Sequence, residues 1–408
     1  MTKFPDGFLW GAATAGHQVE GGNVNSDMWE AEWAESSGFA EPSGDACDHY
    51  HRYPEDIATI ADLGLNAYRF SVEWSRIEPE EGFFSRAALD HYRRMAATCH
   101  EHGVTPVVTY NHFTSPRWFA HLGGWASPTG VDRFARYCEQ VTAHLGDLFT
   151  WACTLNEPNV ISLLMQTGVA PAGASEDSDR IAALAEAISE NQSSSPTPSA
   201  WGGQAVDTMG ALHQRAVEAI KSTRSEIKVG WTLALIDLQA VDGGDERCES
   251  VRKAGELDWL DVSRGDDFVG VQTYSRNLIG PNGRVEPPAG TPTTQVGWEL
   301  YPDALEHTVR LAAEHTGLPV MVTENGMATD DDDERIDYTR RALEGLGRAC
   351  DDGVDVRGYL HWTLLDNFEW VSGFGPKFGL IAFNRKTFER TVKPSARWLG
   401  EVARANKI

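Results

Sequence analysis

Two glutamates stand in polar motifs that could carry out acid–base chemistry. Glu157 lies in the segment TLNEP at positions 154–158, and Glu324 lies in VTENG at positions 322–326. Glycoside hydrolysis requires two carboxyl groups, one protonated and the other ionised. The protonated group donates to the departing oxygen, while the ionised group attacks the anomeric carbon and forms a covalent intermediate that water later releases. One such glutamate alone is more often an ion-pair or capping residue, so the hypothesis depends on both.

Other polar and aromatic side chains also stand in or near the ends of short apolar or β-branched runs. Arg69 could hold one carboxyl group in its ionised form by opposite charge, while crowding and burial raise the pKa of the other. The remaining residues of this kind are Glu73, Trp74, Asn111, His112, Asn156, Gln272, Tyr274, Asn325 and the segment 366–370.

Eight such runs alternate with longer helical patterns, which is typical of repeated βα units. The runs span residues 9–15, 67–74, 105–112, 149–157, 228–235, 268–275, 319–326 and 357–366. Helices are expected between several of them, for example over 54–62 and 85–102, each closed by a glycine. Eight parallel strands with outer helices close into a barrel whose reactive side chains gather at the carboxyl ends of the strands. We therefore predict an α/β fold: a single (β/α)8 TIM barrel with elaborated loops at those ends, in which residues 1–408 form one catalytic domain.

Charge and cysteine content favour a neutral small-molecule substrate. The 408 residues carry a net charge of −25, which disfavours attraction to nucleic acid or to an anionic membrane. The six cysteines include no CxxC pair, so neither a zinc cluster nor a disulfide framework is indicated, and no cofactor or metal is expected. The sequence shows neither an apolar signal-peptide run at its start nor an apolar run of membrane-spanning length, so we expect a cytoplasmic protein.

Five segments together resemble glycoside hydrolase family 1, the β-glucosidase and β-galactosidase family, over essentially the whole chain. They occur in the family's order. They are residues 4–15 with QVEG at 18–21, residues 68–77, 154–158 and 322–326, and residues 362–370.

The resemblance implies that Glu157 is the acid/base and Glu324 the nucleophile, and that Arg69 and Tyr274 contact the nucleophile and tune its charge. It also implies a set of sugar-binding residues, among which Trp362 forms a platform beneath the sugar ring. That set is Gln18, His112, Asn156, Gln272, Trp362, Glu369 and Trp370. Gln272 stands where the family usually has Asn, so its reach towards the sugar is altered.

The expected activity is retaining hydrolysis of non-phosphorylated β-O-glycosides, most readily β-glucosides, with β-galactosides and β-fucosides left open. Glu369 argues against a phosphorylated sugar, because a dianion needs a cation there. Glu157 argues for O-glycosides, since thioglucoside-cleaving relatives have Gln in its place. The alternatives are a transglycosylase that uses the same residues and a degenerate barrel that only binds sugar. A metal-dependent hydrolase would need further ligands beside His112. The oligomeric state is not predicted.

Three other segments invite interpretation. The triplet at 49–51, His-Tyr-His, precedes a predicted helix and is interpreted as capping or surface packing rather than as a metal site. The acidic run at 330–334 is interpreted as a solvated loop leading into a helix rather than as a calcium site. Residues 173–210 are predicted to form a surface excursion after the fourth strand.

Overall fold

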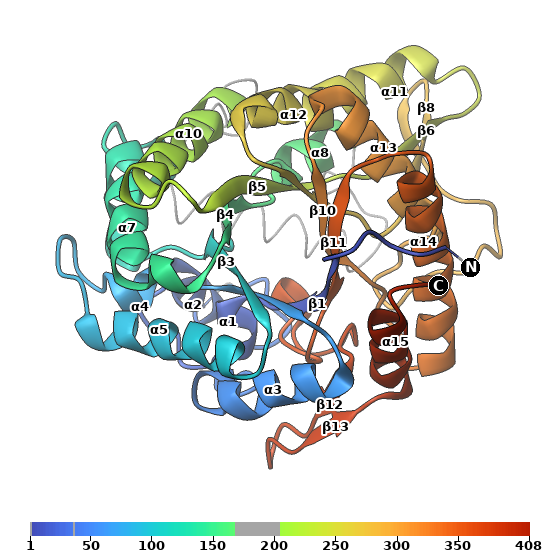
Figure 1. Cartoon of the computed structure of the whole chain (residues 1–408). Helices are drawn as coiled ribbons and strands as arrows, with labels where there is room; N and C mark the ends of the chain where they lie inside the picture. The colour runs from blue at the N-terminus through green and yellow to red at the C-terminus, as the bar shows by residue number, and fades with distance from the viewer. Residues whose placement is uncertain (1, 36, 168–204) are drawn as a thin grey trace.

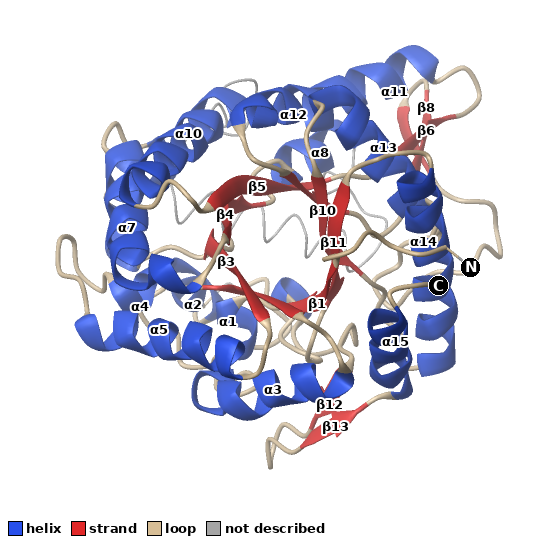
Figure 2. Cartoon of the chain, in the orientation of Figure 1, coloured by secondary structure: helices blue, strands red, loops and turns tan. Residues whose placement is uncertain are grey.

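The computed structural model describes residues 2–35, 37–167 and 205–408, and its centre is a closed barrel of eight parallel strands. Figure 2 shows the strands as an inner ring surrounded by helices. The strands follow the order β1-β11-β10-β7-β5-β4-β3-β2 around the barrel. They are β1 (Leu9–Ala13), β2 (Ala67–Ser71), β3 (Thr105–Asn111), β4 (Trp151–Asn156), β5 (Lys228–Ala234), β7 (Val269–Gln272), β10 (Val320–Asn325) and β11 (Val356–Trp362). The predicted TIM barrel is confirmed, and each predicted run overlaps one barrel strand.

Helices of varied length follow the strands, and the longer ones form the outer layer (Figure 1). They are α1 (Gly16–Val19), α2 (Asp27–Glu32), α3 (His49–Leu63), α4 (Trp74–Ile77), α5 (Arg86–Glu101), α6 (Arg117–His121), α7 (Gly130–Leu145), α8 (Val160–Thr167), α10 (Ala205–Thr223), α11 (Asp245–Arg252), α12 (Asp258–Val262), α13 (Ala304–Thr316), α14 (Asp332–Asp351) and α15 (Pro394–Ala405). Local signals set several ends: the Ser85 side chain caps α5, and Gly64 closes α3 with a positive φ of 86°.

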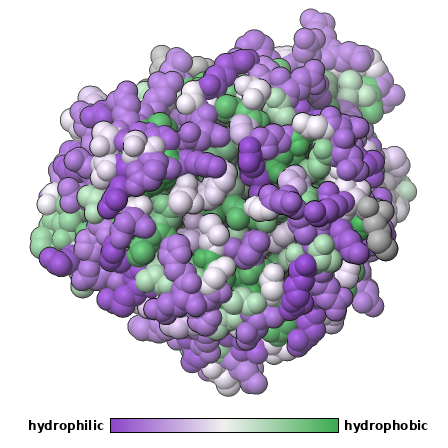
Figure 3. Space-filling view, viewed as in Figure 1, coloured by the Kyte–Doolittle hydropathy of each residue, from purple (hydrophilic) through white to green (hydrophobic). Residues whose placement is uncertain are grey.

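Successive residues of each strand belong to different apolar clusters. Ala12, Tyr68 and Val108 join the large cluster packed with the helices. Their strand neighbours, such as Ala67 and Val107, join a smaller cluster. Because side chains alternate between the two faces of a strand, this smaller cluster fills the inside of the barrel. Polar residues cover most of the face shown in Figure 3, with scattered hydrophobic patches.

Two small sheets extend the barrel and were not predicted. One has the strand order β6-β8-β9, with β6 (Asp237–Ala240), β8 (Arg276–Gly280) and β9 (Gly283–Val285). The other is a hairpin near the C-terminus, formed by β12 (Ile381–Phe383) and β13 (Arg390–Val392). Across the described ranges, no helix combines the length and apolarity needed to cross a membrane.

The structure corrects several predicted boundaries. Helix α3 begins at His49, five residues before the predicted start, because buried contacts of His49 with Asp56 and Tyr68 hold its first turn. His49 is therefore buried within α3, and its interpretation as a capping or surface-packed residue before the helix was wrong. Glu157, placed inside the fourth run, lies one residue beyond β4.

The acidic run does lead into a helix, α14, whose N-terminus the Asp331 side chain caps. Residues 168–204 of the predicted surface excursion lie outside the described residues. Residues 205–210 belong to α10 rather than to the excursion, since their apolar side chains pack into the core cluster.

Candidate active site

The two glutamates of the predicted pair stand at the same end of the barrel. Glu324 lies in β10, Glu157 follows β4 directly, and β7 and β5 separate those two strands. The backbone of Glu157 has a positive φ of 43°, which is strained for a residue with a side chain. Its N–H donates to the carbonyl oxygen of Thr232 on β5, at 2.8 Å, so the neighbouring strand holds this turn in place.

Glu324 has hydrogen-bond donors on both carboxyl oxygens. Arg69 Nη1 lies 2.6 Å from Oε1, and the Tyr274 hydroxyl donates to Oε2 at 2.6 Å. The other guanidinium nitrogen, Nη2, donates to Asn156 Oδ1, so Arg69 bridges β10 and β4 from inside the barrel. Burial raises the pKa of Glu324, whereas Arg69 and the Tyr274 hydroxyl oppose that rise by stabilising the carboxylate.

Glu157 has a different environment. Its Oε1 accepts a hydrogen bond of 2.7 Å from the Gln272 amide, a neutral donor. Burial, followed by the negative charge of Glu324, raises the pKa of Glu157 to about 8, so it holds a proton at neutral pH. A cavity of about 50 Å³ adjoins Glu157 and is lined mainly by apolar side chains, including Phe113 and Ile161.

Gln18 and Glu369 form a second polar cluster at the site. The Gln18 amide nitrogen donates to the carbonyl oxygen of Phe368 at 2.7 Å, to Asn367 Oδ1 at 3.0 Å and to Glu369 Oε2 at 3.3 Å. Burial and then the charge of Glu324 raise the pKa of Glu369 to about 8. The cluster joins α1 to the loop after β11, segments that lie some 350 residues apart in the sequence.

Four of the predicted sugar-binding residues each keep one buried polar atom with no hydrogen-bond partner in the described chain. The atoms are Gln18 Oε1, His112 Nδ1, Asn156 Nδ2 and Glu369 Oε1. Burying a polar atom without a partner costs roughly 1–3 kcal/mol, so such groups are typical of sites that a ligand completes. Burial lowers the pKa of His112 far below its usual range, so its ring is neutral and can donate or accept.

Four aromatic rings form a stacked row beside these polar groups. Trp362 stacks on His112 with centroids 5.7 Å apart, and His112 stacks on Trp370 at 6.2 Å. His17 continues the row, parallel to Trp370 at 5.8 Å, and bonds to Glu32 at 2.6 Å. His17 was not predicted as a site residue, although its place directly before Gln18 was a signal that could have indicated it.

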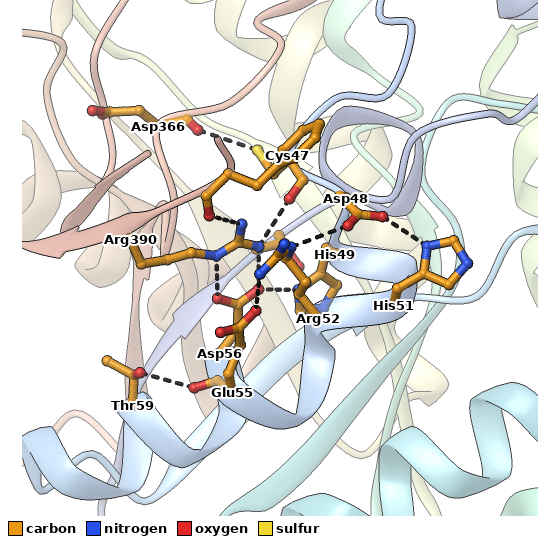
Figure 4. Close-up of polar contacts among 12 residues, drawn as sticks. Cys47, Asp48, His49, His51, Arg52, Glu55, Asp56, Thr59, Asp366 and Arg390 are labelled. Carbon is orange, nitrogen blue, oxygen red and sulfur yellow. Dashed lines mark hydrogen bonds and ion pairs between the residues drawn. The ribbon is translucent and has the colours of Figure 1, made fainter. Parts of the chain in front are cut away.

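The loop that carries Glu369 and Trp370 is held from outside the barrel by the contacts drawn in Figure 4. The thiol of Cys47 donates to the carbonyl oxygen of Asp366 at 3.3 Å. Arg390 of β13 binds the carbonyl oxygen of Cys47 and both carboxylate oxygens of Asp56 in α3. The fold brings together the residues predicted to be catalytic, to contact the nucleophile or to bind sugar, whereas Trp74, also noted at a strand end, packs in the large apolar cluster beside Tyr137 of α7. Within the described ranges, no three His, Cys, Asp or Glu side chains are grouped as metal ligands would be.

A family comparison identifies the chain. The model of "Glycosyl hydrolase family 1" matches residues 1–256 and 267–408. The chain belongs to glycosyl hydrolase family 1. This family 1 chain is therefore a glycoside hydrolase, and the mechanism general to the family retains the anomeric configuration.

Relatives of this family 1 chain span nearly its whole length. "Beta-glucosidase A" of Thermotoga maritima is 31% identical over 468 residues, covering 100% of this chain and 99% of the relative. A "Bifunctional beta-D-glucosidase/beta-D-fucosidase" of Bifidobacterium breve is 32% identical over 456 residues, covering 97% of each chain. The chain in the crystal structure of beta-glycosidase BGL167 is 53% identical to this chain, with a TM-score of 0.90. The match covers 99% of this chain and 98% of the BGL167 chain.

Proposed function

We propose that this protein hydrolyses non-phosphorylated β-O-glycosides by double displacement, with β-glucosides as the principal substrates and β-fucosides and β-galactosides as further candidates. Glu157 is the acid/base and Glu324 the nucleophile. The proposal of these roles is based on the contrast between the environments of the two glutamates. Glu324 contacts a cation and a phenol, which favour its carboxylate, whereas Glu157 contacts an amide and has a pKa of about 8.

In the first step the carboxylate of Glu324 attacks the anomeric carbon while Glu157 protonates the departing oxygen. In the second step Glu157 takes a proton from water, whose oxygen displaces Glu324 from the anomeric carbon. The inversion at each step leaves the configuration unchanged. Arg69 and Tyr274 stabilise the charge of Glu324 before attack and again after its release.

The sugar lies among the residues with unpartnered polar atoms, with Trp362 as its platform. Hydroxyl groups at the edge of the ring would complete the hydrogen bonds of Gln18, His112, Asn156 and Glu369. A carboxyl group at position 369 favours a hydroxyl over a phosphate. The names of the two curated relatives support glucosides and fucosides as substrates. Gln272 and Trp370 are further candidate sugar contacts.

We also infer that residues 1–408 act as one catalytic domain and that the protein is cytoplasmic. The six cysteines are free thiols, and five of them are buried, which suits a reducing compartment. Measuring the enzyme activity in cytoplasmic and exported fractions of the native cell tests the location.

Azide rescue tests the two catalytic roles. Glu157→Ala and Glu324→Ala are assayed with the poorly activated substrate 4-methoxyphenyl β-glucoside, and with 2,4-dinitrophenyl β-glucoside in the presence and absence of azide. Each variant should lose at least about 100-fold in activity towards a poorly activated glucoside. Azide should then yield the β-glycosyl azide from Glu157→Ala and the α-glycosyl azide from Glu324→Ala, because it reacts on opposite faces of the sugar.

Glu256→Gln serves as the control, since Glu256 is also buried with a pKa raised to about 8 but contacts the backbone N–H of Ile236 rather than the site. Full turnover by either alanine variant would rule out its assigned role. Sugar binding without turnover by the wild type would instead indicate a degenerate barrel. Transfer to an added alcohol in preference to water would indicate a transglycosylase.

A further inference from the structure

Gln272 contacts the predicted acid/base. It ends β7, is 1% exposed, and pairs in register with Glu324 of β10. Its Nε2 donates to Glu157 Oε1 at 2.7 Å, and its Oε1 accepts from the Thr323 hydroxyl at 3.2 Å. Gln272 therefore joins the strand that carries Glu324 to the side chain of Glu157.

The bonding of this amide differs from that of the other amides at the site. Gln18 and Asn156 each keep one polar atom with no partner in the described chain, as a ligand-binding amide does. Both polar atoms of Gln272 are instead engaged within the protein. The Thr323 hydroxyl can donate to the carbonyl end at 3.2 Å or to the backbone carbonyl oxygen of Val271 at 3.4 Å, and with the carbonyl end placed there the amide end faces Glu157.

We propose that Gln272 is a positioning residue that occupies Oε1 of Glu157 and thereby assigns the transferable proton to Oε2. This inference rests on the proposed acid/base role of Glu157. An amide N–H cannot accept a proton from Oε1, and Oε1 already accepts a hydrogen bond, so the unoccupied oxygen is the one that exchanges protons with the substrate.

The assignment is consistent with both steps of the reaction. In the first, the Oε2–H bond breaks and the proton passes to the glycosidic oxygen, which leaves with the electron pair of the broken C–O bond while Glu324 bonds the anomeric carbon. In the second, an O–H bond of water breaks, the proton returns to Oε2, the water oxygen bonds the anomeric carbon, and the ester bond to Glu324 breaks with its electron pair on the carboxylate. Oε1 accepts from Gln272 throughout, and the bond is stronger when Glu157 is ionised.

Gln272 should therefore also assist the second step, in which Glu157 acts as the base. Burial and Glu324 raise the pKa of Glu157, and the hydrogen bond from Gln272 opposes them. Without Gln272, Glu157 should hold its proton to a higher pH.

The test compares Gln272→Leu, Gln272→Asn and Thr323→Val with the wild type. We measure kcat/KM against pH for 4-nitrophenyl β-glucoside. The basic limb reports Glu157, which must be protonated in the first step. In Gln272→Leu this limb should move to higher pH by about 0.5–1 unit, as expected when a carboxylate loses one charge-assisted hydrogen bond. Gln272→Asn, one methylene shorter, and Thr323→Val, which releases the far end of the amide, should shift it less and in the same direction.

Leaving groups provide a second measurement that a merely structural role would not change selectively. Gln272→Leu should lose roughly tenfold in kcat/KM with 4-methoxyphenyl β-glucoside and much less with the 2,4-dinitrophenyl glycoside, whose departure needs little protonation. Gln295→Leu is the control, because Gln295 bonds Asp330 and the Lys377 backbone away from Glu157. Thermal unfolding checks that each variant is folded. If Gln272→Leu does not fold, the pH profiles of Gln272→Asn and Thr323→Val test the role of Gln272 instead.

The outcomes separate this inference from the proposed function. An unchanged basic limb with equal losses for all leaving groups would overturn the role of Gln272, while azide rescue of Glu157→Ala would still support the acid/base. A shift of the limb to lower pH would overturn it as well, since the amide would then stabilise the protonated acid. If Glu157→Ala remained fully active, the proposed function itself would fail.

Discussion

The Arg69 guanidinium donates a hydrogen bond to one carboxyl oxygen of Glu324, and the Tyr274 hydroxyl donates to the other. Such donors matter because burial alone would favour the neutral acid, which cannot attack. The phenol is itself buried, and its pKa is raised well above the usual range by burial and by the charge of Glu324. It therefore stays a hydrogen-bond donor at every pH at which the enzyme would work.

Tyr274→Phe removes one of these donors without changing the ring. A carboxylate that loses a hydrogen bond has a higher pKa, and the nucleophile must be ionised to react. The acid limb of the kcat/KM profile should therefore move to higher pH, and the maximum should fall about 10- to 100-fold. Tyr301→Phe, which removes a hydroxyl bonded to Gln239, should change neither, and an unmoved acid limb in Tyr274→Phe would remove Tyr274 from its assigned role.

At the scale of elements, the C-terminal hairpin is tied to α3 close to the loop that carries the candidate sugar-binding residues Glu369 and Trp370. Arg390 is 10% exposed and Asp56 1%, and two hydrogen bonds of 2.9 and 2.8 Å join them. Burial acts to raise the pKa of Asp56, but Arg390 and His49 lower it below its ordinary value. Asp56 is thus a buried carboxylate whose charge depends on its partners.

Arg390→Met should leave the buried carboxylate of Asp56 without its main partner. Breaking a buried ion pair costs about 3–5 kcal/mol, measurable as a loss in the free energy of unfolding in urea at pH 7. Arg385→Met provides a matched control on the same hairpin, because its pair with Glu41 is half-exposed and should contribute no more than about 1 kcal/mol. Equal effects of the two substitutions would show that the Arg390 contact does not anchor the hairpin.

At the scale of the whole molecule, the two ends of the chain meet beside the barrel. The backbone N–H of Thr2 donates to the carbonyl oxygen of Ile408, and Trp10 Nε1 donates to Asn406 Oδ1. The termini accordingly lie close together in Figure 1. Helix α15 completes the outer ring through a close contact with α3, where a Cβ on Gly400 would lie 1.9 Å from the carbonyl oxygen of Leu63.

Gly400→Ala should therefore destabilise the whole barrel. Alanine in a helix is ordinarily favoured over glycine by about 1 kcal/mol, but here the methyl group must push α15 away from α3. We expect a net loss of about 2–3 kcal/mol, seen as a lower unfolding midpoint in one cooperative transition. Gly265→Ala, where an added Cβ meets no atom within 4 Å, should have little effect, and a Gly400→Ala protein as stable as the wild type would contradict the proposed contact.

The sequence by itself predicted the eight barrel strands and the barrel, and it named Glu157 and Glu324 as the candidate catalytic pair. The strands and the barrel depend on local information, because a β-branched run of strand length is apolar wherever it lies and the carboxyl ends of parallel strands meet at one end of a barrel. The two glutamates were named because their motifs resemble those of a known family. The predicted strand ends were less accurate, as at Glu157, where the backbone leaves the extended conformation one residue earlier than predicted, with a φ of 43°.

The resemblance implied the contacts of Arg69 and Tyr274 with Glu324, which the structure shows, but tertiary structure alone decided that Gln272 contacts Glu157 and how each proton is held. Arg69 and Glu324 are 255 residues apart, and Gln272 and Glu157 are 115 apart, so no spacing along the chain could show that the cation contacts one carboxyl group and the amide the other. The stacking of His17 and the support from Arg390 likewise arise only on folding. The pKa of a carboxyl group depends on burial and on charges within a few ångströms, and both are properties of the folded barrel.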